Sequence, residues 1–281
     1  MPCETWILPA EAEGQKAETY VRKACPQLTE SALRRLFSKR DVLLDARRIS
    51  RDTPLHAGQQ LKIYLPASAE QALDIVWEDG DILLVNKRPG LSVEADGSGI
   101  PSLTELCLRH TPWAAPCHRL DVRTGGLCLF AKNPRALEIL LRVFRERTLD
   151  KRYICLVQGM PKPPSASCSA WLLKDSEAGR VRILDHPLPG AKAITTEYET
   201  LESGPVSRLS VHLVTGRTHQ IRAHLAALGH PILGDDVYGD RSFNRQYKAR
   251  SLKLCAVSLR LDTGGAFPAL DGREFTIDPP F

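Results

Sequence analysis

The stretch HRLDVRTGGLCLFAKN, residues 118–133, constrains the fold of this 281-residue chain more than any other. Its apolar run LCLFA is short and continuous, so it predicts a buried strand. The glycine pair before the run allows a positive φ or a close backbone approach. Asp121 stands at the entrance to this strand between Arg119 and Arg123, and nearby positive charge keeps a carboxylate ionised. The pattern suits a nucleophile or base, and equally a structural Asp–Arg ion pair.

The remaining pattern consists mostly of strand runs with a few amphipathic helices between them. IVWEDGDILLVNK, residues 75–87, predicts a hairpin around an Asp-Gly turn. Asn133 and Pro134 predict the cap and first residue of a helix, and residues 218–230 predict another helix that ends at Gly229. We therefore expect an α+β fold with a large mixed, mostly antiparallel sheet and flanking helices.

The first part of the chain differs from the rest. Residues 16–65 predict two short helices and a hairpin, and residues 34–51 carry seven Lys and Arg against two acids. These cations can form one basic face for RNA or an ordinary solvated surface. Residues 66–74 are polar and rich in Pro and Ala, so we expect a linker there. The predicted domains are residues 1–66, a small α/β domain, and residues 67–281.

Composition indicates a globular protein of the cytoplasm. Net charge is +5 and the sequence pI is about 8.8, a mild excess that is consistent with an anionic partner. We see no signal peptide and no apolar run of membrane-spanning length. The eight cysteines form no C-x-x-C pair, so we expect reduced thiols and no zinc. We predict a cytoplasmic monomer without membrane association.

Four further segments complete a pattern with the first. They are TGRTHQIRAHLAALGHPILGDDVYG (215–239), LLVNKRPGLSV (83–93), KRYICLVQG (151–159) and AITTEYETL (193–201). In this order they resemble the RluA family of pseudouridine synthases, over roughly residues 70–260. Residues 1–66 resemble the RNA-binding domain of the ribosomal protein S-four type, which often precedes this catalytic domain.

The resemblance implies isomerisation of uridine to pseudouridine in structured RNA, with large-subunit ribosomal RNA favoured and transfer RNA possible. It places the catalytic Asp at Asp121, its Arg partner at Arg222, and a Tyr that stacks on the target base at Tyr153. The isomerisation transfers no electrons, so no cofactor is expected. Metal is not expected either, because His219 and His224 are five residues apart and no H-E-x-x-H pattern is present.

RNA contacts are expected from two groups of residues. Near the site they are Arg119, Arg123, Arg217, His219 and Gln220; in the first domain they are Arg34, Arg35, Arg47 and Arg48. A target base inside RNA has to leave its stack, and an Arg can fill or hold the gap.

Two other functions remain open. One is a non-catalytic RNA-binding or ribosome-assembly protein, which the intact Asp121 disfavours. The other is a glycosidase, which usually needs two acids; no second acidic residue is identified in the motif segments. The chain also departs from the family where Gly125 replaces Ser and where Cys255 stands in place of His.

Overall fold

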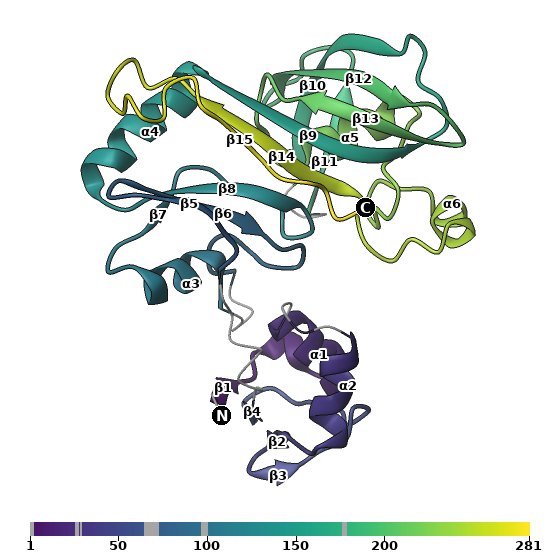
Figure 1. Ribbon diagram of the computed structural model, residues 1–281. Coiled ribbons are helices and arrows are strands. Elements are labelled where there is room, and N and C mark those ends of the chain that lie inside the picture. The colour runs from purple at the N-terminus through teal and green to yellow at the C-terminus, as the bar shows by residue number, and fades with distance from the viewer. Residues whose placement is uncertain (1–2, 26–27, 29, 65–72, 97–100, 176–178) are drawn as a thin grey trace.

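The computed structural model describes residues 3–25, 28, 30–64, 73–96, 101–175 and 179–281. These residues form two sheets, each with a hydrophobic core of its own. Figure 1 shows the smaller unit, drawn in purple, below the larger one. The expected linker and the boundary at residue 66 fall mostly outside the described residues, so the domain limits stay a prediction.

The smaller unit has a four-stranded sheet in the order β1-β4-β2-β3. Trp6, Leu33 and Ile63 are buried in its core between the sheet and the two helices. Glu4 lies 4.0 Å from Arg109 of the larger unit. Its elements are β1 (Cys3–Ile7), η1 (Ala10–Ala12), α1 (Ala17–Ala24), α2 (Glu30–Ser38), β2 (Val42–Leu44), β3 (Arg47–Arg48) and β4 (Gln60–Tyr64).

The larger unit is built mainly from strands, with four helices among its described residues. Its first half contains β5 (Ile75–Glu78), β6 (Ile82–Lys87), α3 (Leu103–His110), β7 (Ala115–Pro116), β8 (Gly125–Ala131) and α4 (Pro134–Glu146). Its second half contains β9 (Leu149–Gln158), β10 (Ser165–Asp175), β11 (Arg180–Leu184), β12 (Lys192–Glu202), β13 (Val206–His212), α5 (Gln220–Ala227), α6 (Arg241–Gln246), β14 (Leu254–Leu261) and β15 (Glu274–Thr276).

The sheet of the larger unit runs in the order β11-β10-β12-β13-β9-β14-β8-β6-β5. β15 also pairs with β14, and β7 pairs with β8. Every pair is antiparallel except β14 with β8, which is parallel and joins the two halves of the sheet. The predicted α+β class with a mixed, mostly antiparallel sheet is confirmed.

Helix boundaries that depend on residues close together in the chain test the sequence predictions. Helix α4 begins as predicted: the Asn133 side chain accepts a hydrogen bond from the Ala136 N–H, and Pro134 takes the first helical position. The helix predicted over residues 218–230 is shorter, because it begins at Gln220 and ends at Ala227. His219 has a left-handed φ of 54°, so the chain turns there instead of continuing a helix.

The junction between the two halves depends on Gly126. Its φ is +114°, and a Cβ at this position would lie 2.2 Å from the Ala256 backbone oxygen on β14. The register pairs Gly126 with Ala256 and Gly125 with Cys255, so both departures from the family meet at one place. Glycine is therefore required where the two strands approach.

We predict that Gly126→Ala destabilises the protein by about 3 kcal/mol or more, through left-handed strain and a clash with backbone that cannot rotate away. Urea unfolding followed by circular dichroism measures the loss. Gly80→Ala is the matched control, since a Cβ there meets nothing within 4 Å, and it should leave the midpoint unchanged. Equal midpoints for the two variants would contradict this account of the junction.

Candidate active site

Asp121 lies in a tight loop just before β8. The Thr124 N–H donates to the Asp121 backbone oxygen at 3.0 Å, which closes the turn. The Asp121 side chain is 23% exposed, so the carboxylate borders open space while its backbone is fixed. The sequence placed Asp121 at the entrance to a buried strand, and the structure has it there.

Lys87 anchors this loop from below. Its ammonium donates to the backbone oxygens of Leu91 at 2.8 Å, Val122 at 3.2 Å and Arg88 at 3.3 Å. The side chain is 1% exposed, and burial lowers the pKa of Lys87 to about 8. Because Val122 follows Asp121 directly, Lys87 ties the loop to the end of β6. Sequence reasoning assigned no role to Lys87.

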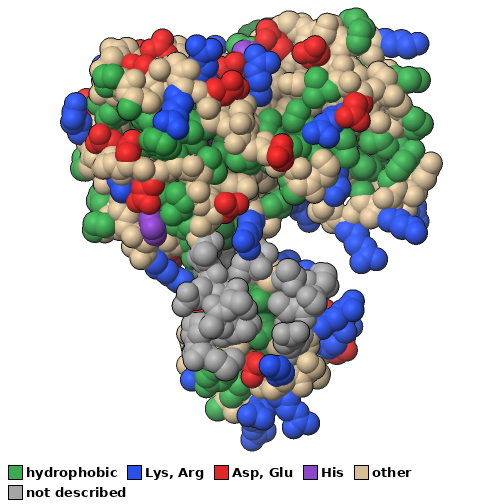
Figure 2. Space-filling view, viewed as in Figure 1, with side chains coloured by type: hydrophobic (Ala, Val, Ile, Leu, Met, Phe, Trp, Pro, Cys, Tyr) green, Lys and Arg blue, Asp and Glu red, His purple; other side chains and the backbone are tan. Residues whose placement is uncertain are grey.

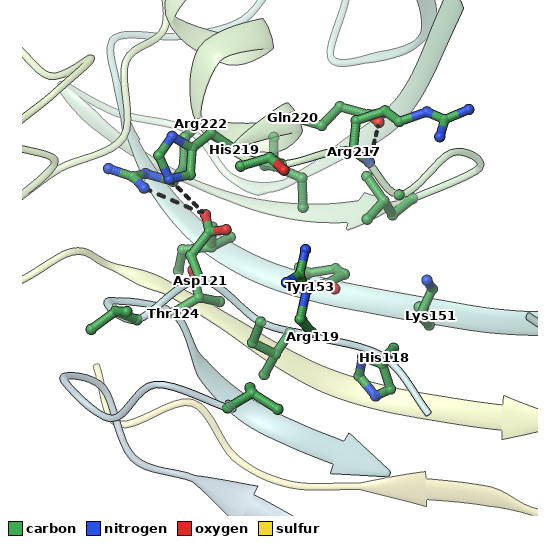
Figure 3. A pocket seen from close by; sticks show the side chains of 18 of the residues that line it. His118, Arg119, Asp121, Thr124, Lys151, Tyr153, Arg217, His219, Gln220 and Arg222 are labelled. Carbon is green, nitrogen blue, oxygen red and sulfur yellow. Dashed lines mark hydrogen bonds and ion pairs between the residues drawn. The ribbon is translucent and has the colours of Figure 1, made fainter. Parts of the chain in front are cut away.

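Arg222 on α5 points at Asp121 from the other half of the sheet. Its Nη1 lies 3.4 Å from Asp121 Oδ2. The guanidinium is 3% exposed, so it is a buried cation and not a surface helix residue. Figure 3 shows the two side chains meeting at one end of the cleft. The structure therefore brings together the Asp and Arg that the sequence analysis paired.

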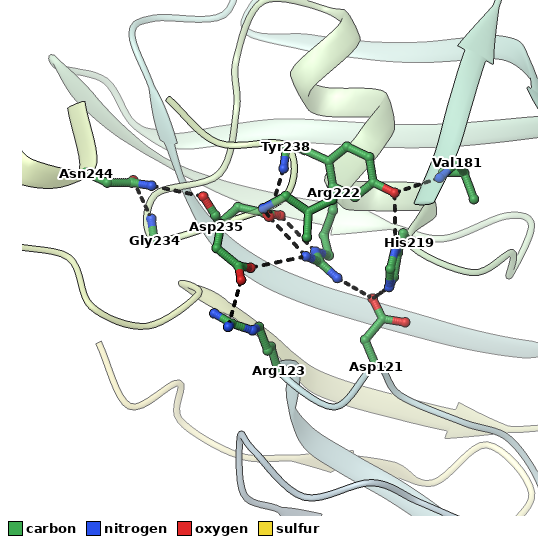
Figure 4. A network of polar contacts seen from close by, with 11 residues as sticks. Asp121, Arg123, Val181, His219, Arg222, Gly234, Asp235, Tyr238 and Asn244 are labelled. Carbon is green, nitrogen blue, oxygen red and sulfur yellow. Dashed lines mark hydrogen bonds and ion pairs between the residues drawn. The ribbon is translucent and has the colours of Figure 1, made fainter. Parts of the chain in front are cut away.

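Asp235 holds Arg222 more tightly than Asp121 does. Arg222 Nε and Nη2 donate to the two Asp235 oxygens at 2.7 and 3.0 Å, a two-bond pair with fixed orientation (Figure 4). Burial alone raises the pKa of Asp235, but hydrogen bonds and charge from Arg222, with the Val237 and Tyr238 N–H groups, lower it below its usual value. The pair leaves Nη1 free to face Asp121.

The expectation of a single acid in the motif segments is wrong. Asp235 and Asp236 both lie in the 215–239 segment and both approach Arg222, Asp236 at 3.9 Å. Asp235 is fully buried and bound to Arg222 and backbone, so it orients the cation and does not supply a second reactive carboxylate. The Gly-Asp-Asp sequence in the turn after α5 was the signal from which these two acids could have been found.

A chain of polar groups runs behind the site through His219 and Tyr238. The Tyr238 hydroxyl accepts from the Val181 N–H at 2.8 Å and lies 3.0 Å from His219 Nδ1 (Figure 4). With that hydroxyl donating to Nδ1, the His219 Nε2–H faces Asp121, whose Oδ2 is 3.9 Å away. Burial lowers the pKa of His219; Asp121 opposes the shift and Arg222 adds to it.

Asp121, Arg222 and Tyr153 border one open cleft of about 1320 Å³. Tyr153 on β9 is 6% exposed; burial raises its pKa, and the charge of Asp121 raises it further. Its hydroxyl is therefore neutral at ordinary pH. In Figure 3 Tyr153 lies between Asp121 and Lys151 along the cleft. The cleft offers an anion, a cation and an aromatic side chain in one space.

The predicted RNA-contacting residues divide into two kinds. Arg119, Arg123 and Arg217 are exposed along the cleft, where Arg119 pairs with Glu94 at 3.2 Å and Arg123 with Asp236 at 2.7 Å. These exposed arginines are free to exchange such partners for phosphate. His219 is mostly buried beside Asp121.

Gln220 is placed differently from the expected RNA contact. It is 2% exposed, and its carbonyl oxygen accepts from the Thr215 hydroxyl and the Arg217 N–H. Its amide donates to the Thr195 backbone oxygen and the Thr196 hydroxyl, both at 3.0 Å. All its polar atoms are thus occupied within the protein, so we assign it to holding the loop and not to RNA.

His118 is fixed as a neutral side chain. Its Nε2 accepts from the Leu129 N–H at 3.1 Å, and its ring stacks on Phe144 with centroids 4.9 Å apart. Burial and the nearby charge of Lys151 lower the pKa of His118 to about 3. It therefore cannot serve as a proton donor at neutral pH.

The described residues contain no cluster of three His, Cys, Asp or Glu side chains that could hold a metal ion. His224 bonds the Thr196 hydroxyl and His230 the Gln158 backbone oxygen, at separate places in the fold. All eight cysteines lie in described parts of the chain, and none forms a disulfide. No helix among the described ranges has the length and apolar character to cross a bilayer.

Comparison with known proteins identifies the class that this fold and cleft define. The profile of the RNA pseudouridylate synthase family matches residues 81–227, which include Asp121, Tyr153 and Arg222. The chain belongs to this family and is an RNA pseudouridine synthase of the RluA type.

Similar proteins support this assignment along most of the chain. Ribosomal large subunit pseudouridine synthase C of Vibrio vulnificus (strain CMCP6) is 32% identical over 88% of this chain and 84% of its own length. The protein of the same name from Escherichia coli (strain K12) is 33% identical over 84% and 80%. Among solved structures, human RNA Pseudouridylate Synthase Domain Containing 1 aligns with a TM-score of 0.63 and 30% identity, covering 75% of this chain and 85% of that chain.

We predict that Asp235→Asn costs roughly 3–5 kcal/mol of stability at pH 7, because it leaves the Arg222 charge buried without its main partner. Thermal unfolding measures the loss. The Asp235 pKa is lowered in the folded protein, so its contribution is present above the unfolded value of about 3.9 and is lost as the pH falls through the folded value. The wild type and the variant should therefore converge in acid.

Asp236→Asn is the matched control for that experiment. Asp236 carries the same charge one residue away but is 46% exposed, so its removal should cost at most about 1 kcal/mol. If both variants lost the same stability, Asp235 would not be the residue that fixes Arg222.

Proposed function

We propose that this enzyme isomerises uridines of large-subunit ribosomal RNA, with Asp121 as the catalytic group. The observation that carries the proposal is the approach of Arg222 Nη1 to Asp121 Oδ2 at the edge of the cleft. In the reaction the uracil N1–C1′ bond breaks, the base turns, and a C5–C1′ bond forms. C5 loses a proton and N1 gains one, so no atoms or electrons are gained or lost overall.

In this proposal the protein supplies an anion for the ribosyl centre or the base ring and a pocket for the detached base. A carboxylate serves the first need, as it does in glycosidases. Tyr153 supplies a neutral aromatic face for the second. The target uridine turns out of the RNA stack into the cleft, at a cost of a few kcal/mol, and Arg119 and Arg123 at the rim hold the displaced strand.

The substrate part of the proposal rests on the relatives and on charge. The named relatives act on the large ribosomal subunit, which favours its RNA over transfer RNA. The Lys and Arg side chains at the free end of the smaller unit support an S-four-like RNA-binding role for residues 1–66 (Figure 2). Arg34, Arg47 and Arg48 are exposed on the smaller unit, and the Arg35 side chain lies outside the described residues. We further propose that the enzyme works as a monomer in the cytoplasm, with ribosomal RNA.

Pseudouridine mapping tests the substrate. Ribosomal and transfer RNA from cells with and without the gene are treated with carbodiimide and read by primer extension. We expect one or more pseudouridines of large-subunit RNA to disappear with the gene. Loss confined to transfer RNA would contradict the substrate assignment, and no loss anywhere would contradict the proposed reaction.

Asp121→Asn should abolish isomerisation and retain RNA affinity, because the shape of the cleft is nearly unchanged. Tritium release from [5-³H]uridine-labelled RNA measures turnover, and a filter-binding assay measures affinity. Asp96→Asn removes a charge from the same cleft and should retain activity. Turnover of Asp121→Asn within about tenfold of wild type would remove Asp121 from the mechanism.

Neutralising Arg34, Arg35, Arg47 and Arg48 together should weaken RNA binding and flatten its salt dependence. Each lost phosphate contact lowers the slope of log affinity against log salt by roughly 0.7–0.9. Turnover on saturating RNA should persist, because Asp121 lies in the larger unit. Neutralising four exposed arginines of that unit, Arg180, Arg182, Arg241 and Arg245, is the charge-matched control. Equal slopes for the two quadruple variants would assign the first set to a solvated surface.

A further inference from the structure

The Lys151 ammonium lies in the cleft. The roles proposed for Asp121, Arg222 and Tyr153 do not involve it. It lies on β9 two residues before Tyr153, so the two side chains leave the same face of the strand. Both line the cleft, and Figure 3 shows them side by side. The strand rise puts Lys151 about 6–7 Å along the cleft from Tyr153.

Three other lysines of the protein have anionic or carbonyl partners. Lys132 bonds Glu78 at 2.8 Å, Lys16 bonds Asp52 at 2.9 Å, and Lys87 bonds three backbone oxygens. For Lys151, no acid of the described chain lies within ion-pair distance of the ammonium. The ring of Phe144 lies near it, with Nζ 5.2 Å from the ring centroid.

The surroundings of Lys151 favour an anion. A Cβ at Gly216 would lie 3.6 Å from its Nζ, so the ammonium lies close to the exposed loop that precedes α5. On its own strand the neighbours Asp150 and Arg152 pair with each other, and they leave the opposite face. Cations outnumber acids along the rest of the cleft, and His118 there is neutral. Other charged or titratable groups that line it are Arg119, Arg123, Arg145, Arg147, Arg217, Arg222, Glu94, Asp96, Asp121, Asp236, His219 and Tyr153.

We propose that the Lys151 ammonium binds a backbone phosphate of the RNA next to the uridine that enters the pocket. The proposal rests on the proposed function, since it requires RNA in this cleft. A phosphate would supply the missing counter-charge to a partly buried cation and hold the target nucleotide in register with Tyr153 and Asp121. Lys151 is thus a binding and positioning residue and not a catalytic one.

The proposal has a pH signature of known sign. Burial lowers the pKa of free Lys151 to about 8. A bound phosphate favours the ammonium, so the pKa rises in the complex and RNA binds the protonated form. The affinity for RNA is therefore highest below pH 8, and it falls by up to about tenfold per pH unit as the pH rises above 8. Lys87 has a similar pKa, but its ammonium is bound to carbonyls away from the RNA.

The test measures binding of a fluorescent single-stranded oligouridylate by anisotropy from pH 7 to 9, in the inactive Asp121→Asn protein. Lys151→Met should weaken binding roughly 10- to 100-fold at pH 7 and lower the salt slope by roughly 0.7. Lys151→Arg keeps its charge at every pH, so it should bind at pH 7 and lose the pH dependence. Lys253→Met removes a lysine that lies on the Phe281 ring outside the cleft and should match the parent.

Each result decides for or against the proposal. A pH-dependent parent with a flat Lys151→Arg profile supports it. A parent with no decline, or a Lys151→Arg variant with the same decline, overturns it, and so does unchanged affinity of a folded Lys151→Met. Failure of the proposed function is seen separately, because it would appear as absent pseudouridine formation by the protein with Asp121 intact.

Discussion

The site depends on one buried cation. Arg222 is almost fully removed from water, and an isolated charge in such a place costs several kcal/mol. Asp235 offsets this free-energy cost through two short hydrogen bonds and its own negative charge. Asp121 adds a second, weaker ion pair from the cleft side. The strong pair fixes the guanidinium, and the weaker contact leaves the Asp121 carboxylate open to a substrate.

The loop that carries Asp121 is also held in place by contacts from neighbouring parts of the protein. Lys87 holds the loop through carbonyls, and Gly126 lets β8 run close against β14 immediately after it. The backbone that carries the Asp121 carboxylate is therefore held by Lys87 and by the β8–β14 pairing before RNA binds. Preorganised groups of this kind lose little entropy on binding, which favours catalysis over adaptable contact.

Local features of the fold were predictable from sequence. The cap of α4 at Asn133 and the Asp-Gly hairpin depend on residues close in the chain, and the long motif segments identified Asp121 and Arg222. Asp235 was missed because its partnership with Arg222 forms only when the turn after α5 folds back across 13 residues. The burial of Lys87, the isolation of Lys151 and the enclosure of Gln220 likewise depend on segments that meet only in the folded sheet.

The placement of β14 has a consequence for how the protein is made. β14 occupies the middle of the sheet between β9 and β8, although Leu254–Leu261 are synthesised more than a hundred residues after β8. During translation each half-sheet therefore waits with an open edge, the kind of surface that chaperones cover and that pairs with other chains. The two halves of the sheet can join only after residues 254–261 have been made, because β14 pairs with β9 on one side and with β8 on the other.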